Sequence, residues 1–281
     1  ALHGHTVTVY DRKPKAGGLN EYGIAAYKST DDFAAREVEW LLKIGGITLQ
    51  TGKELGRDMT LESLQSSFDA VFLGIGLGGV NALGLGGEDM AGVSNAVDFI
   101  ADLRQAVDKS TLTIGRDVVV IGGGDTGSDC VGTSNRQGAA SITQFELMPK
   151  PPESRSTIMP WPTYPMVMKT TSSHEEGCER QWAVATKEFI GDETGNLKAL
   201  KTVELEWKSD DGRPSKFTER PGSEKIISCE LVLLAMGFVA PEKDGILDTL
   251  DIELDDRGNV RATEKEFKTN IGKIFACGDM R

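Results

Sequence analysis

The chain has 281 residues and a formal net charge of −12, and 39% of its residues are hydrophobic. This length allows two domains of ordinary size with a substantial core. The negative charge argues against nucleic acid or an anionic membrane as the main partner. The sequence has no run of about 18 apolar residues, so no membrane span is predicted. The first residues lack the pattern of a signal peptide, so we expect a cytoplasmic location.

The beginning of the chain predicts a β-strand that ends in an acidic residue. His5–Tyr10 alternates and is rich in valine and threonine, and Asp11 follows it. In a Rossmann unit an acidic residue at the end of the second strand accepts hydrogen bonds from a ribose diol. The first strand and glycine loop of that unit would lie about 25–30 residues upstream, before Ala1. Either the sequence is a fragment or Asp11 is a plain turn residue, and we favour the fragment.

A glycine-bearing loop over Gly17–Ile24 precedes a predicted helix over Asp31–Ile44. Asp31 is a suitable helix cap. The expected apolar stripe of this helix consists of Phe33, Val38, Leu41 and Leu42.

Three further elements are predicted before the centre of the chain. Thr60–Phe68 is expected to form a short helix capped by its threonine, and Asp69–Gly76 a buried strand that ends in glycines. A nucleotide can lie against the backbone at such a strand end. A helix over Ala96–Val107 and a linker over Asp108–Arg116 then lead to the central motif.

The central motif is a short apolar strand that runs directly into a glycine-rich turn and a helix. Val118–Ile121 has the β-branched composition of a strand buried on both faces. Gly122 permits the tight turn, Gly124 lets the backbone approach a pyrophosphate, and Gly127 lets the following helix, Ser128–Gln137, pack on the strand. The N–H groups and positive dipole end of that helix can hold phosphates. The sequence therefore predicts a dinucleotide site here.

An acidic residue follows the glycine motif at an informative distance. Glu146 ends a predicted strand over Ser141–Leu147, 19 residues after Gly127. At this spacing an acidic residue binds the adenosine ribose of NAD, and its charge repels the 2′-phosphate of NADP. We therefore favour NADH. Lys150 and Arg155 follow closely and could reach a phosphate, and Glu146 could also be an ordinary solvated residue at a strand end.

The rest of the chain predicts a proline-rich excursion, a set of antiparallel strands and two more strand ends with glycine. Lys150–Trp161 is too rich in proline for a regular helix or a central strand. Leu231–Met236 is apolar and leads to Gly237, and Ile274–Asp279 ends in a Gly-Asp pair. The antiparallel strands are expected at Lys187–Ile190, Leu200–Trp207 and Phe217–Thr218.

The four cysteines show no clustered spacing. None of them forms a C-x-x-C motif, which argues against a local redox disulfide, a zinc ribbon or an iron–sulfur site in this stretch. We expect reduced cysteines and no metal site. The residues concerned are Cys130, Cys178, Cys229 and Cys277.

Several stretches together resemble the small (β) subunit of glutamate synthase, within the pyridine nucleotide-disulfide oxidoreductase-like flavoproteins. They are GGGDTGSDC at 122–130, FELMPKPP at 145–152, PWP at 160–162, HEE at 174–176, FIGD at 189–192, LAMGF at 234–238 and ACGD at 276–279. The front part, with YGIAAYKSTDD at 22–32 and GIGLGGVNAL at 74–83, resembles the flavin subunit of NAD-dependent dihydropyrimidine dehydrogenase. We favour glutamate synthase because its motifs are longer and lie in the variable second domain.

The resemblance implies an α/β fold with two Rossmann-like dinucleotide-binding domains. An NAD(P)H-binding domain over residues 111–238 would be inserted into a discontinuous FAD-binding domain. The two parts of that FAD-binding domain would cover residues 1–110 and 239–281.

The implied activity is that of an NAD(P)H-dependent FAD oxidoreductase. It would pass hydride from NAD(P)H to FAD, and electrons on to iron–sulfur clusters in a missing segment or in a partner, the large glutamate synthase subunit or an equivalent. No catalytic acid or nucleophile is implied, because hydride transfer requires positioning and electrostatics rather than a side-chain acid. The alternatives are an electron-input subunit of dihydropyrimidine dehydrogenase and a nucleotide-binding scaffold without redox activity.

The resemblance also assigns residues to the two cofactors. Asp11 would bind the FAD ribose, and Asp279 would lie beside the ribitol. The flavin would be lined by Gly17, Gly18 and Leu19, and the FAD nucleotide by Gly74 and Gly76. The pyridine nucleotide site would consist of Gly122, Gly124, Asp125, Thr126, Gly127 and Glu146. Gly237 and Gly278 are further strand-end glycines expected to lie against a nucleotide.

Overall fold

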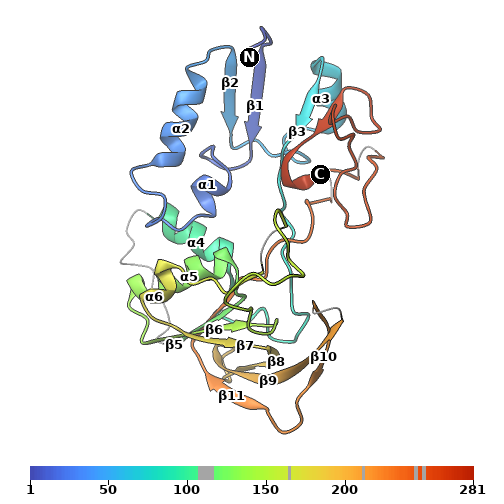
Figure 1. Cartoon of the computed structure of the whole chain (residues 1–281). Coiled ribbons are helices and arrows are strands. Elements are labelled where there is room, and N and C mark those ends of the chain that lie inside the picture. Colours follow the sequence, from blue (N-terminus) through green and yellow to red (C-terminus); the bar gives the residue numbers. More distant parts are fainter. Residues whose placement is uncertain (107–116, 164–165, 211–212, 244–245, 249–250) are drawn as a thin grey trace. The chain divides into compact units, whose positions relative to one another are not determined.

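The computed structural model describes residues 1–106, 117–163, 166–210, 213–243, 246–248 and 251–281 (Figure 1). The chain divides into two compact units. Unit 1 comprises Ala1–Glu21, Asp31–Asn81 and Gly237–Arg281, and unit 2 comprises Tyr22–Thr30 and Ala82–Met236. The predicted linker Asp108–Arg116 and the predicted domain boundary at residues 110 and 111 lie outside the described residues.

Unit 2 is built on a five-stranded parallel sheet. Its strand order is β4-β12-β5-β6-β7, so the strand before the glycine motif is central. Residues 118–120 are buried, as the apolar β-branched sequence predicts. The strands are β4 (Val93–Asn95), β12 (Leu231–Leu234), β5 (Asp117–Ile121), β6 (Ser141–Glu146) and β7 (Glu179–Trp182).

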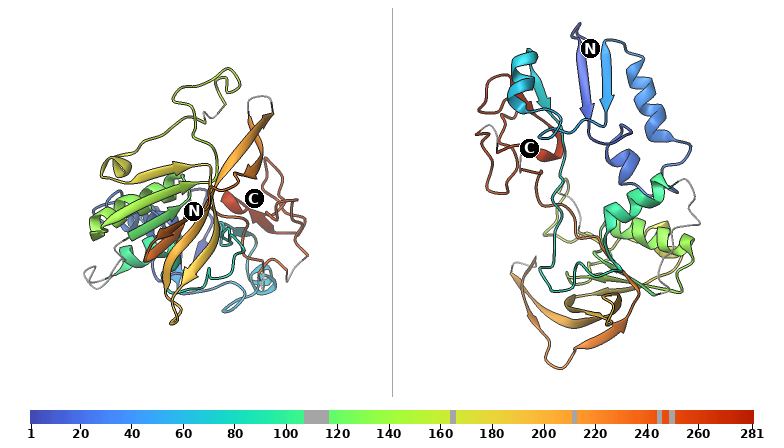
Figure 2. Two further views of the ribbon diagram at one scale, coloured as in Figure 1. Left: turned by 90° about the horizontal axis from the view of Figure 1, so that it is seen from below. Right: turned by 180° about the vertical axis from the view of Figure 1, so that it is seen from behind.

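Helices cover one face of this parallel sheet and an antiparallel sheet covers the other (Figures 1 and 2). Val120 packs toward the helical side with Ile142 and Leu233, whereas Val119 packs with Phe145 and Val232 toward the antiparallel sheet. The helices are α4 (Ala96–Gln105), α5 (Asp125–Gln137) and α6 (Ser172–Glu175), and the antiparallel strands are β8 (Val184–Gly191), β9 (Leu197–Asp210), β10 (Arg213–Glu219) and β11 (Lys225–Ser228).

Two segments that the sequence prediction placed in the first FAD part pack in unit 2. Residues 82–106 belong there because β4 pairs with β12 and α4 packs against α5. Residues 22–30 are bound to α5: the Ala25 N–H donates to Asp129 Oδ2 at 3.0 Å, and Lys28 forms an ion pair with the same carboxylate. The Tyr27 hydroxyl lies 2.7 Å from Ser173 Oγ.

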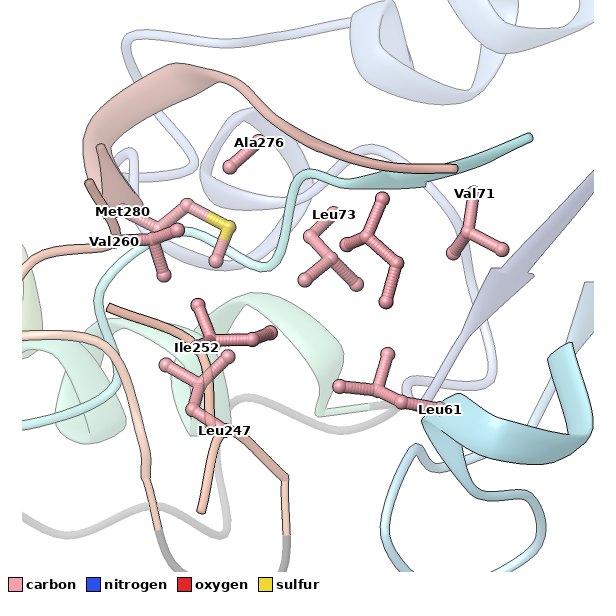
Figure 3. Packing of buried hydrophobic residues seen from close by; sticks show 9 residues of the cluster. Leu61, Val71, Leu73, Leu247, Ile252, Val260, Ala276 and Met280 are labelled. Atoms are coloured by element: carbon pink, nitrogen blue, oxygen red, sulfur yellow. The ribbon is translucent and has the colours of Figure 1, made fainter. Parts of the chain in front are cut away.

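Unit 1 contains two separate two-stranded parallel sheets. β1 (Val7–Asp11) pairs with β2 (Ile47–Thr51), and β3 (Val71–Leu73) pairs with β13 (Ile274–Ala276). The core of the unit lies beside the second pair, where Leu61 and Leu73 meet Leu247, Val260 and Met280 (Figure 3). The short helices of the unit are α1 (Leu19–Tyr22), α2 (Phe33–Leu42), α3 (Leu61–Ser67) and η2 (Gly278–Met280). The last residue of α1, Tyr22, is already counted in unit 2.

The two predicted helices of unit 1 have different outcomes. α3 forms as expected, and Thr60 Oγ1 accepts a hydrogen bond from the Ser63 N–H at 3.2 Å. α2 is shorter than predicted, and Asp32 rather than Asp31 occupies its N-cap, with φ of 51° and no side-chain cap bond. The expected apolar stripe was wrong for two of its four members: Phe33 and Leu41 are 54% and 43% exposed, Val38 and Leu42 are partly buried, and the residue that the helix buries is Ala34.

Within the described ranges, no helix is both long and apolar enough to span a bilayer. The same part of the chain contains no group of three or more histidine, cysteine or acidic side chains arranged to hold a metal ion.

Candidate functional site

The turn between β5 and α5 has the geometry that the glycine motif predicts. Gly122 follows the strand with φ of +125°, a conformation that L side chains rarely adopt, and its N–H donates to the Phe145 carbonyl at 2.8 Å. Gly124 is the N-cap of α5, and the Ser128 N–H donates to its carbonyl at 3.0 Å. The helix begins at Asp125, three residues earlier than the sequence predicts.

Two of the motif glycines are required by close contacts. A Cβ added at Gly122 would lie 2.1 Å from the Ala235 carbonyl oxygen. A Cβ added at Gly127 would lie 2.2 Å from the Gly122 carbonyl oxygen and 2.7 Å from Gln144 Nε2. Strand, turn and helix therefore touch through backbone atoms, as the sequence argument for Gly127 expects.

The outer face of the same turn is open. A Cβ added at Gly124 would meet no atom within 4 Å, and Gly124 and Asp125 are exposed while Thr126 is partly buried. The first N–H groups of a 13-residue helix point out of this face without helical partners. Backbone donors, a positive helix dipole and free space fit the pyrophosphate of a dinucleotide.

Glu146 is the last residue of β6, and its carboxylate contacts the glycine turn. Its Oε2 accepts a hydrogen bond from the Gly123 N–H at 2.8 Å, and its Oε1 accepts one from the Met148 N–H at 3.1 Å. The carboxylate therefore lies beside the open face of the turn. A carboxylate oxygen has further acceptor capacity after one such bond, so Glu146 can still accept from a ribose hydroxyl.

The predicted FAD residues of unit 1 fall into two sets. Asp11 ends β1, and its Oδ1 accepts from the Lys13 N–H at 2.9 Å. Gly17 and Gly18 adopt φ of +132° and +54° in the loop that leads to α1, and Leu19 is 50% exposed. A glycine loop therefore follows the strand that carries Asp11.

The second set lies at the ends of β3 and β13. Because these strands are parallel, with Ala276 opposite Leu73, their carboxyl ends meet at one edge. Gly74 and Gly76 follow β3, and Gly278 and the exposed Asp279 begin the 3₁₀ turn after β13. Gly237 lies at the return into unit 1, where its carbonyl accepts from the Asn81 N–H at 3.1 Å.

The cysteines are all free. Burial raises the pKa of the Cys130 thiol strongly and that of the Cys229 thiol to about 12, so both stay protonated at neutral pH. Cys178 and Cys277 are partly buried.

Sequence reasoning missed the polar side chains behind the glycine turn. Gln144 is 2% exposed in β6, and His174 is 9% exposed in α6. The His174 Nε2 lies 3.0 Å from Gln144 Oε1. The available signal was Gln144 inside an apolar strand: a buried polar side chain needs hydrogen-bond partners, so other polar groups had to lie close to it.

Comparisons with known proteins agree with this architecture. The family model for pyridine nucleotide-disulphide oxidoreductases matches residues 1–281. The chain is 39% identical over 287 residues to the glutamate synthase [NADPH] small chain of Mycobacterium tuberculosis, covering 99% of this chain and 57% of that protein. It is 36% identical over 291 residues to the glutamate synthase [NADH] of Saccharomyces cerevisiae, covering 99% of this chain and 14% of that protein.

A solved structure shows the same fold. FprA of Mycobacterium tuberculosis in complex with NADPH matches with a TM-score of 0.73 and 14% identity, over 98% of this chain and 72% of that one. The chain belongs to the pyridine nucleotide-disulphide oxidoreductase family. Its curated relatives include glutamate synthase small chains, which confirms the predicted resemblance and the predicted α/β fold class. Family membership supports FAD and NAD(P)H as the cofactors.

Proposed function

We propose that this chain carries the NAD(P)H- and FAD-binding part of a glutamate synthase small subunit. The observation that carries the proposal is the β5–α5 turn, with its open glycine face and exposed helix N-terminus, in a chain that matches glutamate synthase small chains over 99% of its length. The chain spans 57% of the length of the Mycobacterium tuberculosis small chain. The glutamate-forming activity and the large-subunit partner are therefore part of the proposal.

In this function unit 2 binds the pyridine nucleotide and unit 1 binds FAD. Bound FAD supplies the capacity to accept hydride and release single electrons, which would pass to iron–sulfur clusters in a partner. The residues of the chain bind and orient: Gly124 and the α5 N-terminus face the pyrophosphate, and Glu146 faces the adenosine ribose. Asp11, Asp279 and the loop at Gly17 take the corresponding roles toward FAD.

The visible absorption spectrum of the purified chain with FAD, before and after anaerobic NADH, tests this function. Retained flavin that is bleached by NADH is the expected result. Retained flavin that stays oxidised would contradict hydride transfer and would favour a scaffold without redox activity. Flavin that is lost while NADH still binds would mean that the chain acts as an isolated pyridine-nucleotide domain. If flavin is bleached, formation of glutamate with the added large subunit, by transfer of the glutamine amide nitrogen to 2-oxoglutarate and reduction of the product, is the expected activity, rather than reduction of uracil.

Within this function we propose that NADH is preferred to NADPH. The Glu146 carboxylate lies beside the open face of the turn, where its charge opposes a 2′-phosphate. The names of the relatives include both NADPH and NADH, so Glu146 is the observation that supports the preference.

Two substitutions of Glu146 test the preference. Glu146→Gln keeps an acceptor for the Gly123 N–H and removes the charge, and Glu146→Arg adds a phosphate ligand. Both should raise the ratio of kcat/KM for NADPH to that for NADH, about tenfold or more for arginine, equivalent to about 1.4 kcal/mol. Glu179→Arg makes the same charge change at the amino end of the neighbouring strand β7, opposite Thr143 rather than Glu146, and should leave the ratio unchanged. An unchanged ratio in Glu146→Arg would rule out the assigned role.

A further inference from the structure

The peptide group between Gly122 and Gly123 is held from both sides by one strand. The Gly122 carbonyl accepts a hydrogen bond from Gln144 Nε2 at 2.9 Å, and the Gly123 N–H donates to Glu146 Oε2 at 2.8 Å. Gln144 and Glu146 are two residues apart in β6, so their side chains project from the same face of the strand. Together they fix the orientation of this peptide plane in the nucleotide turn.

The orientation of the Gln144 amide is set by its second partner. Gln144 Oε1 lies 3.0 Å from His174 Nε2. The other ring nitrogen, Nδ1, accepts a hydrogen bond from the Thr171 N–H at 3.1 Å, so the ring proton must be on Nε2. His174 therefore donates to Gln144, and Gln144 donates to Gly122, in one directed chain.

The surroundings of His174 keep it in the neutral form that this series of hydrogen bonds requires. Burial, then the charges of Arg180 and Lys28, lower the pKa of His174 to about 4. Protonation would place a hydrogen on Nδ1, where the Thr171 N–H already donates. At neutral pH the hydrogen bonds from His174 to Gln144 and from Gln144 to Gly122 are thus intact.

The same group of residues also reaches the first turn of α5. The Thr171 Oγ1 lies 2.6 Å from Ser128 Oγ, and Ser128 is 1% exposed in that helical turn. His174 therefore lies at the junction of the strand, the turn and the helix that make up the nucleotide site.

We propose that His174 and Gln144 are positioning residues for the pyridine nucleotide: they hold the Gly122–Gly123 peptide so that its N–H fixes the Glu146 carboxylate against the ribose. This inference rests on the proposed function of the turn. Gln144 and His174 are buried, whereas Gly124 and Asp125 on the open face are exposed, so neither side chain is part of that face. Their loss should therefore weaken dinucleotide binding and relax the choice between NADH and NADPH.

Substitutions at His174 separate the two hydrogen bonds of the ring. His174→Asn keeps an acceptor near the Thr171 N–H and loses the donor to Gln144, whereas His174→Gln keeps an N–H near Gln144 Oε1 and loses the acceptor. In the full chain we expect His174→Asn and Gln144→Met to raise the Kd for NADH about tenfold, equivalent to about 1.4 kcal/mol. His174→Gln should change it less than threefold.

Thr202→Val serves as the matched control for these variants. Thr202 is 2% exposed in β9, and its hydroxyl donates to the Lys225 carbonyl at 3.5 Å, so this variant also loses a buried polar group of unit 2. Its Kd for NADH, and its ratio of kcat/KM for NADPH to kcat/KM for NADH, should stay within twofold of wild type. The ratio should rise in Gln144→Met, which a general loss of stability would not produce.

Hydrogen exchange of the chain without any nucleotide gives a second readout. The Gly123 N–H should exchange faster in His174→Asn and Gln144→Met than in wild type and in Thr202→Val, because the peptide is no longer held. Unchanged exchange together with unchanged NADH binding in both variants would overturn the positioning role. If wild type itself binds no NADH, the proposed function fails, and the exchange of Gly123 still tests whether His174 and Gln144 hold the peptide.

Discussion

The two units prepare their predicted nucleotide sites in different ways. In unit 2 the glycine turn follows a central strand with a neighbour on each side, and buried side chains hold its peptide groups. In unit 1 the glycines follow strands that each pair with one other strand among the described residues, and β13 is also hydrogen-bonded to residues 267–269. Phe72 in β3 is 62% exposed and stacks on Phe275 in β13 with ring centroids 5.1 Å apart.

This difference teaches that the same glycine-rich chemistry can be preorganised to different degrees. A site whose donors are already held loses little conformational entropy when a ligand binds. A site whose donors are not held in this way gains part of its order from the ligand. We therefore expect unit 2 to bind its dinucleotide with little change and unit 1 to be stabilised more by its cofactor.

The largest expected effect is a difference in stability between alanine variants of two glycines in the same turn. Gly127→Ala would force a Cβ to within 2.2 Å of the Gly122 carbonyl oxygen, so unit 2 should lose about 4 kcal/mol of stability or fail to fold. Gly124→Ala meets no atom within 4 Å, so it should leave the free energy of unfolding nearly unchanged and weaken NADH binding. Denaturant unfolding and NADH titration measure both quantities. Equal stability losses in the two variants would show that the turn is not packed as described.

That contrast also shows how much the sequence can predict. The spacing of the three glycines predicts which of them must pack closely and which must stay open, because the motif is local. The cap of α3 at Thr60 is local in the same sense and was predicted correctly. The apolar stripe of α2 was wrong at Phe33 and Leu41, because their burial depends on what the rest of unit 1 places beside them.

The parts that the sequence does not predict depend on distant partners. β7 has the sequence ERQW, which carries no strand pattern, and it becomes a strand by pairing with β6. His174 and Gln144 are 30 residues apart, and only the fold brings them behind the glycine turn. The packing of residues 22–30 on α5 is likewise a contact across about a hundred residues. Pattern-based reasoning has no access to such pairs.

A matched pair of core leucines measures the difference between the units. Leu233 in β12 is completely buried, and Leu73 in β3 is 3% exposed. Leu233→Ala should cost about 4 kcal/mol, because strands on both sides keep its cavity from collapsing. Leu73→Ala should cost about 2 kcal/mol, because a two-stranded pair can relax around the lost side chain. Denaturant unfolding that gave the larger loss for Leu73→Ala would reverse the comparison.

The smallest expected effect is a pH dependence of unit 2 that originates at His174. Its pKa is about 4 in the folded chain and 6.5 when exposed, so between these values the unfolded chain binds more protons. Stability is therefore lost as the pH falls from about 6.5 toward 4, by about 1 kcal/mol at pH 5.5. The charged groups that act on His174 are Arg180 and Lys28, and Lys28 is paired with Asp129.

The measurement is the difference in Tm between pH 7.5 and pH 5.5 for wild type and for His174→Asn. Wild type should lose about 2–4 °C more than the variant, since asparagine does not titrate and the carboxylates that do are common to both chains. His174→Gln is the second non-titrating control and should behave like His174→Asn. Equal losses in all three chains would show that His174 is not held neutral behind the glycine turn. The preorganisation of unit 2 would then depend on Gln144 and Glu146 without it.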